Sequence, residues 1–214
     1  MKTVILDFDG TLADSFGLCL EIAHELTGKH ILTDRDRIEE LKSSSLIDVA
    51  RELEIPKYEW PRLVIRGRKI MFGRLNELKA FSGMDKVLAE LKNDGFKLYI
   101  MSNNSQDNIA KFLKQHSLSS YITNTYGDIG LLGKTRELKK ILKQNKLRAS
   151  DVVYIGDEVR DIEAAKKADV RVISVSWGFN SAKRLAEDNP DALVYRRSDL
   201  VKAIKSLEKV SSQH

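Results

Sequence analysis

Cysteine and proline are scarce in this chain, and long apolar runs are missing. Its 214 residues include one cysteine, Cys19, so no disulfide can form within the chain, which fits a reducing compartment. Only 3 prolines accompany 12 glycines, which excludes a collagenous or linker-rich protein. No apolar run approaches the roughly 20 residues that cross a membrane, and the N-terminus lacks a signal-peptide pattern. We therefore expect a cytoplasmic protein with no membrane partner.

A strong excess of one charge is missing as well. The 36 Lys and Arg residues are nearly matched by 31 Asp and Glu residues, which leaves a net charge of +5. Opposite charges alternate in helical segments such as 136–146, a pattern typical of solvated helix faces. We therefore expect no nucleic-acid partner, although a mild positive field would help to attract small anionic substrates.

Short β-branched runs alternate with helical patterns through most of the chain. The segments that read as strands are 3–8, 96–101, 121–126, 151–156, 171–176 and 192–195. Most are apolar without clean alternation, as expected for strands buried on both faces of a parallel sheet. Helical spacing follows at 84–95, 106–115, 158–168 and 198–210. The alternation predicts an α/β fold, a Rossmann-like parallel sheet with helices on both faces.

One segment, residues 15–79, breaks this alternation. It shows helical periodicity and no convincing strand, with helices expected at 14–28, 34–42, 45–53 and 60–78. We predict that residues 1–14 and 80–210 form the α/β core and that 15–79 form a small all-helical cap domain inserted after the first strand. The insertion follows a strand's carboxyl end, the edge where ligands bind in such folds.

The first chemical motif is DFDGT at the end of the first strand. Asp7 and Asp9 are two residues apart, so their side chains point to the same face of the strand. One carboxylate could attack a substrate while the other moves protons. Gly10 permits a sharp exit, and Thr11 offers a hydroxyl and an amide to an anion. The alternative is a plain acidic turn; a calcium-binding EF-hand is excluded because Leu18 occupies the bidentate position.

The second motif is MSNN, at the end of the next strand. Ser102 and Asn103 precede a helix whose free amides can bind an oxyanion. The alternative is a cluster of helix-capping residues.

The third motif is Lys134, which with Gly133 opens a helix. A lysine there opposes the helix dipole, so local stability does not explain it. A role in phosphate binding would explain it, because lysine carries a compact ammonium group that can point at a phosphate.

The fourth motif is IGDEVRD, after another buried strand. Acids at a helix start are favoured by capping and by the dipole, which could by itself account for Asp157, Glu158 and Asp161. Placed beside Asp7 and Asp9, however, they would repel one another strongly. Mg²⁺ would relieve this repulsion, because it prefers carboxylate, water and phosphate oxygens.

The four motifs occur in a fixed order at successive strand ends, and here the chain resembles the haloacid dehalogenase superfamily of phosphohydrolases. The resemblance rests on Asp7 and Asp9 in DFDGT, Ser102 in MSNN, Lys134, and Asp157 and Asp161 in GDEVRD. The helical insertion looks like the first type of cap in that superfamily, as in phosphoglycolate phosphatase-like members. The segment SWGF at 176–179 resembles the same branch.

The resemblance implies a Mg²⁺-dependent phosphatase that acts on a small phosphorylated metabolite. In that scheme Asp7 forms an aspartyl-phosphate and Asp9 moves protons, while phosphoryl oxygens are held by Gly10, Thr11, Ser102, Asn103 and Lys134. The Mg²⁺ ligands would be Asp7, Asp157 and the backbone carbonyl of Asp9, supported by Asp161 and Glu158. A carbon–halogen hydrolase would need no leaving-group acid at Asp9.

Two alternatives remain open at this point. A phosphomutase would transfer phosphate between sugar phosphates without net release, and a non-catalytic interaction protein would keep only the fold. We expect a monomer or a dimer. Four arginines of the cap either form a solvated helix face or reach an anionic substrate: Arg62, Arg66, Arg68 and Arg74. No zinc site is expected from the histidines His24, His30 and His116.

Overall fold

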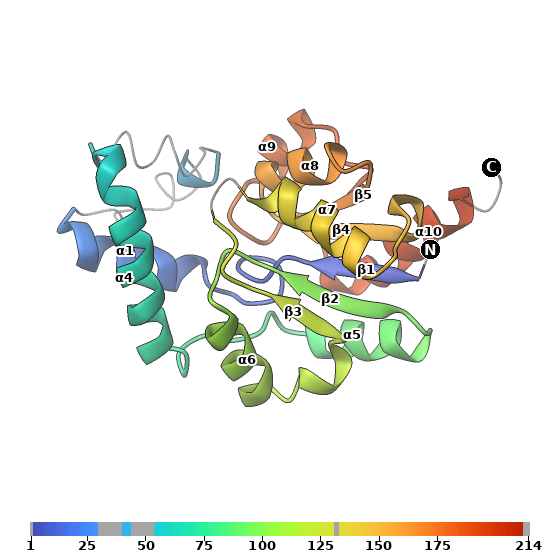
Figure 1. The fold of residues 1–214 in the computed structure, drawn as a ribbon, viewed down its shortest axis with the longest axis horizontal. Helices are drawn as coiled ribbons and strands as arrows, with labels where there is room; N and C mark the ends of the chain where they lie inside the picture. Colours follow the sequence, from blue (N-terminus) through green and yellow to red (C-terminus); the bar gives the residue numbers. More distant parts are fainter. Residues whose placement is uncertain (1, 30–39, 44–53, 131–132, 212–214) are drawn as a thin grey trace.

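The computed structural model describes residues 2–29, 40–43, 54–130 and 133–211 (Figure 1). Its centre is a six-stranded parallel sheet in the order β3-β2-β1-β4-β5-β6. The strands are β1 (Thr3–Leu6), β2 (Lys97–Met101), β3 (Asn124–Tyr126), β4 (Val152–Gly156), β5 (Arg171–Val175) and β6 (Ala192–Val194). Leu6 lies opposite Ile100 of β2 and Ile155 of β4, so the carboxyl ends of the three central strands reach the same edge. The predicted parallel α/β fold is confirmed.

Helices cover both faces of the sheet (Figure 1). The helices of one face are α5 (Met84–Asn93), α6 (Gln106–Gln115) and α10 (Leu200–Ser211), and those of the other are α7 (Lys134–Gln144), α8 (Val159–Lys166) and α9 (Ala182–Glu187). Alternate residues of β1 pack on opposite faces of the sheet. Val4 and Leu6 belong to the hydrophobic cluster under α5, α6 and α10, and Ile5 belongs to the cluster under α7, α8 and α9. All three are fully buried, which explains why the strand reads as a continuous apolar run.

The described part of the insertion after β1 is mainly helical. α1 (Phe16–Thr27) packs against α4 (Trp60–Gly73), which follows a single turn, η1 (Lys57–Glu59). Residues 40–43 are helical, and the remainder of the helices expected at 34–42 and 45–53 lies outside the described residues. The chain leaves and re-enters the core side by side, because the amide of Asp14 donates to the carbonyl of Lys79 (2.9 Å).

Three elements differ from the sequence prediction. The helix expected at 60–78 is shorter, because α4 ends at Gly73 and turns follow at 74–77. The strand expected at 121–126 is shorter, because Ser119–Tyr121 form a 3-10 turn before β3 begins. The short helix α9 was not predicted, since its six residues are too few to show a periodic pattern; Ser181 caps it by accepting from the amide of Arg184 (3.3 Å). Across the described part of the chain, every helix is too short or too polar to span a membrane.

Candidate active site

Asp7 lies at the carboxyl end of β1, at the centre of the sheet edge. Its amide donates to the carbonyl of Ile155 (2.8 Å), so the pairing with β4 continues one residue beyond β1. Its carboxylate is buried; one oxygen accepts from the amide of Phe8 (2.7 Å), and the other accepts from the ammonium of Lys134. The side chain is therefore held in one orientation at the strand end.

Lys134 begins α7 and is buried, as Asp7 is. Its ammonium donates to both Asp7 and Asp161, bridging the first and fourth motifs. Burial by itself would lower the pKa of Lys134, but the carboxylates of Asp161 and Asp7 raise it above its ordinary value. Lys134 therefore carries a full positive charge inside the site.

The turn after Asp9 is shaped around Asp157. Gly10 has a φ of 74°, and a Cβ on it would lie 2.1 Å from a carboxylate oxygen of Asp157, so only glycine fits. The hydroxyl of Thr11 donates to Asp157 (2.6 Å), and the amide of Gly10 donates to the carbonyl of Ala13 (2.9 Å). Both predicted phosphate-binding residues thus contact or shape the acid cluster, and their role toward phosphate stays a prediction.

The SWGF segment completes the surroundings of Asp157. The amide of Phe179 donates to its carboxylate (2.7 Å), and a Cβ on Gly178 would lie 2.2 Å from it. The indole of Trp177 donates to the carbonyl of Thr11 (3.2 Å) and ties this loop to the turn after β1. Sequence reasoning noted SWGF as a resemblance and assigned its residues no contact with the site.

Asp161 and Glu158 shape the start of α8. They form a reciprocal capping box, in which the amide of Glu158 donates to Asp161 (3.0 Å). Asp161 also accepts from the hydroxyl of Tyr154 (3.1 Å), while Glu158 pairs with Arg160 (2.5 Å). The helix-capping explanation therefore holds for both acids, and Asp161 in addition faces Lys134.

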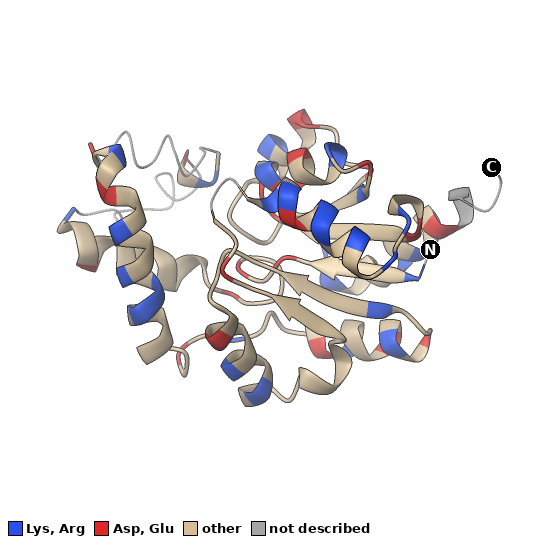
Figure 2. Ribbon diagram, in the orientation of Figure 1, with Lys and Arg blue, Asp and Glu red and all other residues tan. Residues whose placement is uncertain are grey.

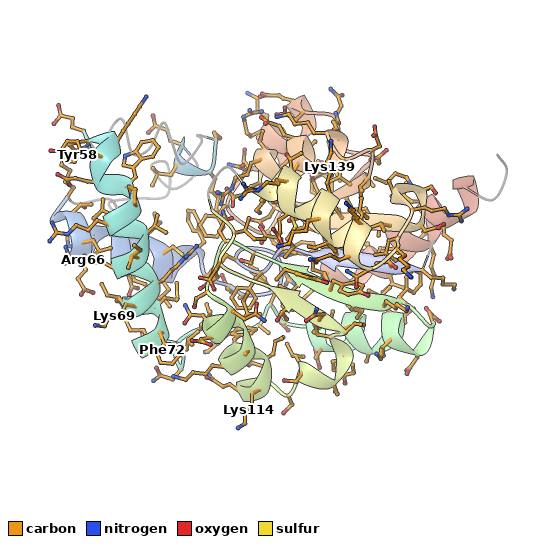
Figure 3. All side chains as sticks on the ribbon, viewed as in Figure 1. Tyr58, Arg66, Lys69, Phe72, Lys114 and Lys139 are labelled. Carbon is orange, nitrogen blue, oxygen red and sulfur yellow. The ribbon has the colours of Figure 1, made fainter. Side chains whose placement is uncertain are left out.

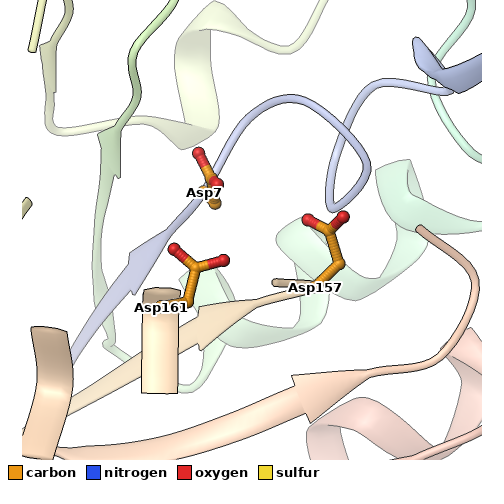
Figure 4. A group of neighbouring side chains, drawn as sticks. All are labelled: Asp7, Asp157 and Asp161. Carbon is orange, nitrogen blue, oxygen red and sulfur yellow. The ribbon is translucent and has the colours of Figure 1, made fainter. Parts of the chain in front are cut away.

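Three carboxylates converge at this edge, those of Asp7, Asp157 and Asp161 (Figure 4). One oxygen from each lies within 4.8 Å of the others, and all three residues are buried. Burial raises the pKa of Asp7 to about 7, with Lys134 opposing the rise and Asp161 adding to it. Burial and the charges of Glu158 and Asp7 raise the pKa of Asp157 well above its ordinary range. Lys134 and the guanidinium of Arg160 are the positive groups that interact with these acids in the described part of the chain. The three carboxylates offer the oxygen ligands that a hard divalent cation prefers.

Asp9 has a different environment from Asp7. Its carboxylate accepts from the side-chain amide of Asn104 (3.0 and 3.3 Å), and it lines a cavity beneath the cap. Burial raises the pKa of Asp9, while the hydrogen bond from Asn104 lowers it. Asn104 is held in turn by Asn108, whose amide donates to it (2.7 Å). Sequence reasoning missed Asn104, although it is the last residue of the quoted MSNN motif.

Ser102 and Asn103 lie at the end of β2, next to β1. The buried Ser102 hydroxyl accepts from the amide of Asn104 (3.0 Å), which fixes the turn into α6. The carbonyl of Asn103 accepts from Arg68 of the cap. The residue that caps α6 is Ser105, whose hydroxyl accepts from the amide of Asn108 (3.2 Å).

The four arginines of the insertion have different surroundings, and a role toward an anionic substrate stays a prediction. Arg68 reaches the core, where it also pairs with Asp128 (3.2 Å). Arg62 and Arg66 are exposed, and Figure 3 shows Arg66 on the outer side of α4. Arg74 pairs with Glu21 (2.5 Å) and Glu77 (2.6 Å) at the rim. Elsewhere both charge signs are interleaved over the outer helices, as expected for solvated faces (Figure 2).

The histidines that the structure describes bind backbone carbonyls. Nδ1 of His24 lies 2.8 Å from the carbonyl of Lys29, and Nε2 of His116 lies 2.9 Å from that of Leu78. His30 lies outside the described residues.

Known proteins resemble this chain along most of its length. Residues 4–175 match the family of haloacid dehalogenase-like hydrolases. A curated relative, phosphoglycolate phosphatase of Synechococcus elongatus, is 32% identical over 210 residues, covering 97% of this chain and 99% of that protein. Pyrophosphatase PpaX of Listeria innocua is 24% identical over 215 residues, covering 97% and 98%.

The fold is likewise found among solved structures. A haloacid dehalogenase-like hydrolase of Streptococcus pneumoniae superposes with a TM-score of 0.78 at 17% identity, covering 95% of this chain and 98% of that one. The comparisons confirm the predicted family and support the predicted enzyme class, a phosphatase. The chain therefore belongs to the haloacid dehalogenase-like hydrolase family.

Proposed function

We propose that this chain is a Mg²⁺-dependent phosphatase that hydrolyses a small phosphorylated metabolite through an aspartyl-phosphate. The observation that carries the proposal is the placement of Asp7: a buried carboxylate at the central strand end, held by Lys134 and surrounded by two further acids. The phosphatase relatives support the reaction type. A strand-end carboxylate fixed in this way is suited to nucleophilic attack on phosphorus.

Asp7 and Asp9 would divide the chemistry between them. An oxygen of Asp7 attacks phosphorus, the ester bond breaks, and Asp9 gives a proton to the departing alcohol oxygen. Water then attacks the aspartyl-phosphate, Asp9 takes its proton, and phosphate leaves with Asp7 restored. The different partners of the two carboxylates, Lys134 for Asp7 and Asn104 for Asp9, support the division.

The transferred phosphoryl group would be held by the residues around Asp7. Lys134 would bring a buried positive charge, and Ser102 and Asn103 would contribute polar groups from the end of β2. The turn residues Gly10 and Thr11 complete the proposed set. These hydrogen-bond donors are already in place, so they would stabilise the negative charge that develops on the phosphoryl oxygens in the transition state.

The acid cluster would hold the Mg²⁺. We assign Asp7, Asp157 and the backbone carbonyl of Asp9 as ligands, with Asp161 and Glu158 positioning them from α8. The three clustered carboxylates, opposed by one ammonium within the described residues, support this assignment. Bound there, Mg²⁺ would neutralise charge on the phosphoryl oxygens. Thr11, Gly178 and the amide of Phe179 keep Asp157 directed at the cluster.

The remaining assignments concern the surroundings of this chemistry. We propose that residues 15–79 act as a cap that excludes bulk water from the core formed by 1–14 and 80–210. We also propose a monomer or dimer in the cytoplasm, with a small phosphorylated substrate and no nucleic-acid or membrane partner.

A panel of phosphate monoesters, assayed for phosphate release with Mg²⁺ and with a chelator, tests the function. We expect release from at least one ester with Mg²⁺ and its loss on chelation, with full recovery when Mg²⁺ is restored. Transfer between sugar phosphates without net release would indicate a phosphomutase instead. The absence of turnover with every ester would favour a non-catalytic interaction protein.

A further inference from the structure

A cavity of about 330 Å³ lies between the cap helices and the core. Its walls come from one face of α1, including Ile22, Ala23 and Leu26, and one face of α4, including Leu63, Val64 and Met71. Its floor comes from core loops and includes Asp9, Asn103 and Asn104. The cavity therefore extends from the second aspartate of DFDGT into the cap.

The spacing of the wall residues explains the apolar lining. Ile22 and Leu26 are one helical turn apart on α1, as Leu63 and Gly67 are on α4. Gly67 faces the same two residues of α1: a Cβ on it would make ordinary van der Waals contact with Leu26 (3.6 Å) and Ile22 (3.7 Å). Leu63 and Leu26 remain half-buried, because the faces they form border the cavity and do not close over it.

Few charged side chains belong to the described lining of this cavity. Among its described lining residues, the charged side chains are Asp9 and Arg68. Arg68 is already engaged by the core, because its guanidinium donates to Asp128 (3.2 Å) and to the carbonyl of Asn103. Burial raises the pKa of the Cys19 thiol, which keeps it neutral. Against the described walls, which are mostly apolar, a carboxylate or a polyol would lose its hydration with few matching hydrogen bonds.

We infer that the substrate is a phosphate monoester of a small apolar alcohol, aliphatic or aromatic, whose carbon chain occupies the cavity between α1 and α4. The inference rests on the proposed function, in which Asp9 gives a proton to the leaving oxygen. Because Asp9 forms part of the cavity floor, the group attached to that oxygen extends between Ile22 and Val64. Burial of its apolar surface would then supply binding free energy.

A series of n-alkyl phosphates from methyl to hexyl tests the inference. All share a primary alcohol as leaving group, so their intrinsic reactivity is nearly constant. We expect kcat/KM to rise about fourfold for each added methylene until the cavity is full. Phosphoglycolate and glucose 6-phosphate should have lower kcat/KM values than the alkyl ester of similar size.

Two neighbouring positions on α4 provide matched variants. Val64→Asp places a charge in the cavity, whereas Ile65→Asp places one on the outer face, where Ile65 is 67% exposed. We expect Val64→Asp to lower the hexyl-to-methyl ratio of kcat/KM by more than tenfold and Ile65→Asp to leave it unchanged. If Val64→Asp does not fold, Ala23→Leu fills part of the cavity and should move the optimum to a shorter chain.

The outcomes separate the inference from the proposed function. Equal kcat/KM across the alkyl series, or a preference for phosphoglycolate, would overturn the apolar substrate class and leave the phosphatase in place. Alkylphosphonates have no ester bond, so calorimetry can follow their binding without turnover. Affinity that rises with chain length, in a protein that hydrolyses no ester, would support the apolar site and overturn the phosphatase.

Discussion

The core edge and the cap cavity meet at Asp9 but offer a substrate opposite surroundings. On the core side the acids of the cluster are buried. The carboxylate of Asp157, for example, accepts from a hydroxyl and an amide, and two glycines leave room for it. On the cap side the described walls are apolar, and Arg68 is engaged elsewhere. The core can thus hold an anion and a cation in fixed geometry, while the cap contributes shape and apolar surface. Under the proposed function, the first region would perform the chemistry and the second would select the leaving group.

The strongest test of the contrast removes the proposed nucleophile. Asp7→Asn keeps the shape of the side chain but removes the attacking oxygen anion, so we expect kcat to fall by at least about 10⁴-fold. Asp14→Asn, an exposed acid in the same loop, is the matched control and should retain kcat. Steady-state phosphate release measures both. Undiminished hydrolysis by Asp7→Asn would end the assignment of chemistry to this edge.

The next largest effect concerns stability. Lys134→Ala leaves Asp7 and Asp161 buried without their ammonium, so we expect the free energy of unfolding to fall by about 3–5 kcal/mol without metal. Lys140→Ala, on the same helix, removes an exposed pair with Glu137 and should cost about 1 kcal/mol or less. Urea denaturation compares the two. Equal losses would mean that Lys134 is not the balancing charge of the cluster.

A smaller effect is expected from crowding Asp157. Gly178→Ala places a Cβ 2.2 Å from its carboxylate, so the acid must move, and we expect a loss of about 1–3 kcal/mol in stability together with weaker Mg²⁺ binding. Gly17→Ala in α1 meets nothing within 4 Å and should be neutral or slightly stabilising. Thermal denaturation with and without Mg²⁺ reports both quantities. Mg²⁺ affinity unchanged by Gly178→Ala would argue against Asp157 as a ligand.

The smallest expected effect on stability and activity comes from the ion pairs of Arg74, just after α4. Arg74 pairs with Glu21 and Glu77 at exposed positions, so Arg74→Ala should change the free energy of unfolding by about 1 kcal/mol or less and leave kcat unaltered. High salt should reduce the difference further, since exposed pairs are screened. A large loss of kcat in this variant would mean that the insertion also contributes to catalysis, contrary to the proposed division between the two regions.

The sequence predicted the secondary structure of the core more completely than that of the insertion. Buried parallel strands have a recognisable apolar pattern, so five of the six predicted strands match closely. Acids of the first and fourth motifs lie close together, while the roles of the site residues stay predictions. The contacts of Asn104 with Asp9 and of Phe179 with Asp157 were missed, because each joins residues far apart in sequence. The helix α9 was missed because it is short.

The sequence by itself determined the α/β alternation, the helical insertion and the order of the four motifs, because periodicity and turn chemistry are local properties of the chain. Only the tertiary structure decided that Lys134 bridges Asp7 and Asp161, that the Thr11 hydroxyl donates to Asp157, and that α1 and α4 border a mostly apolar cavity next to Asp9. These features depend on the distance between segments that are separated by tens of residues. Packing sets that distance, and no local pattern encodes it.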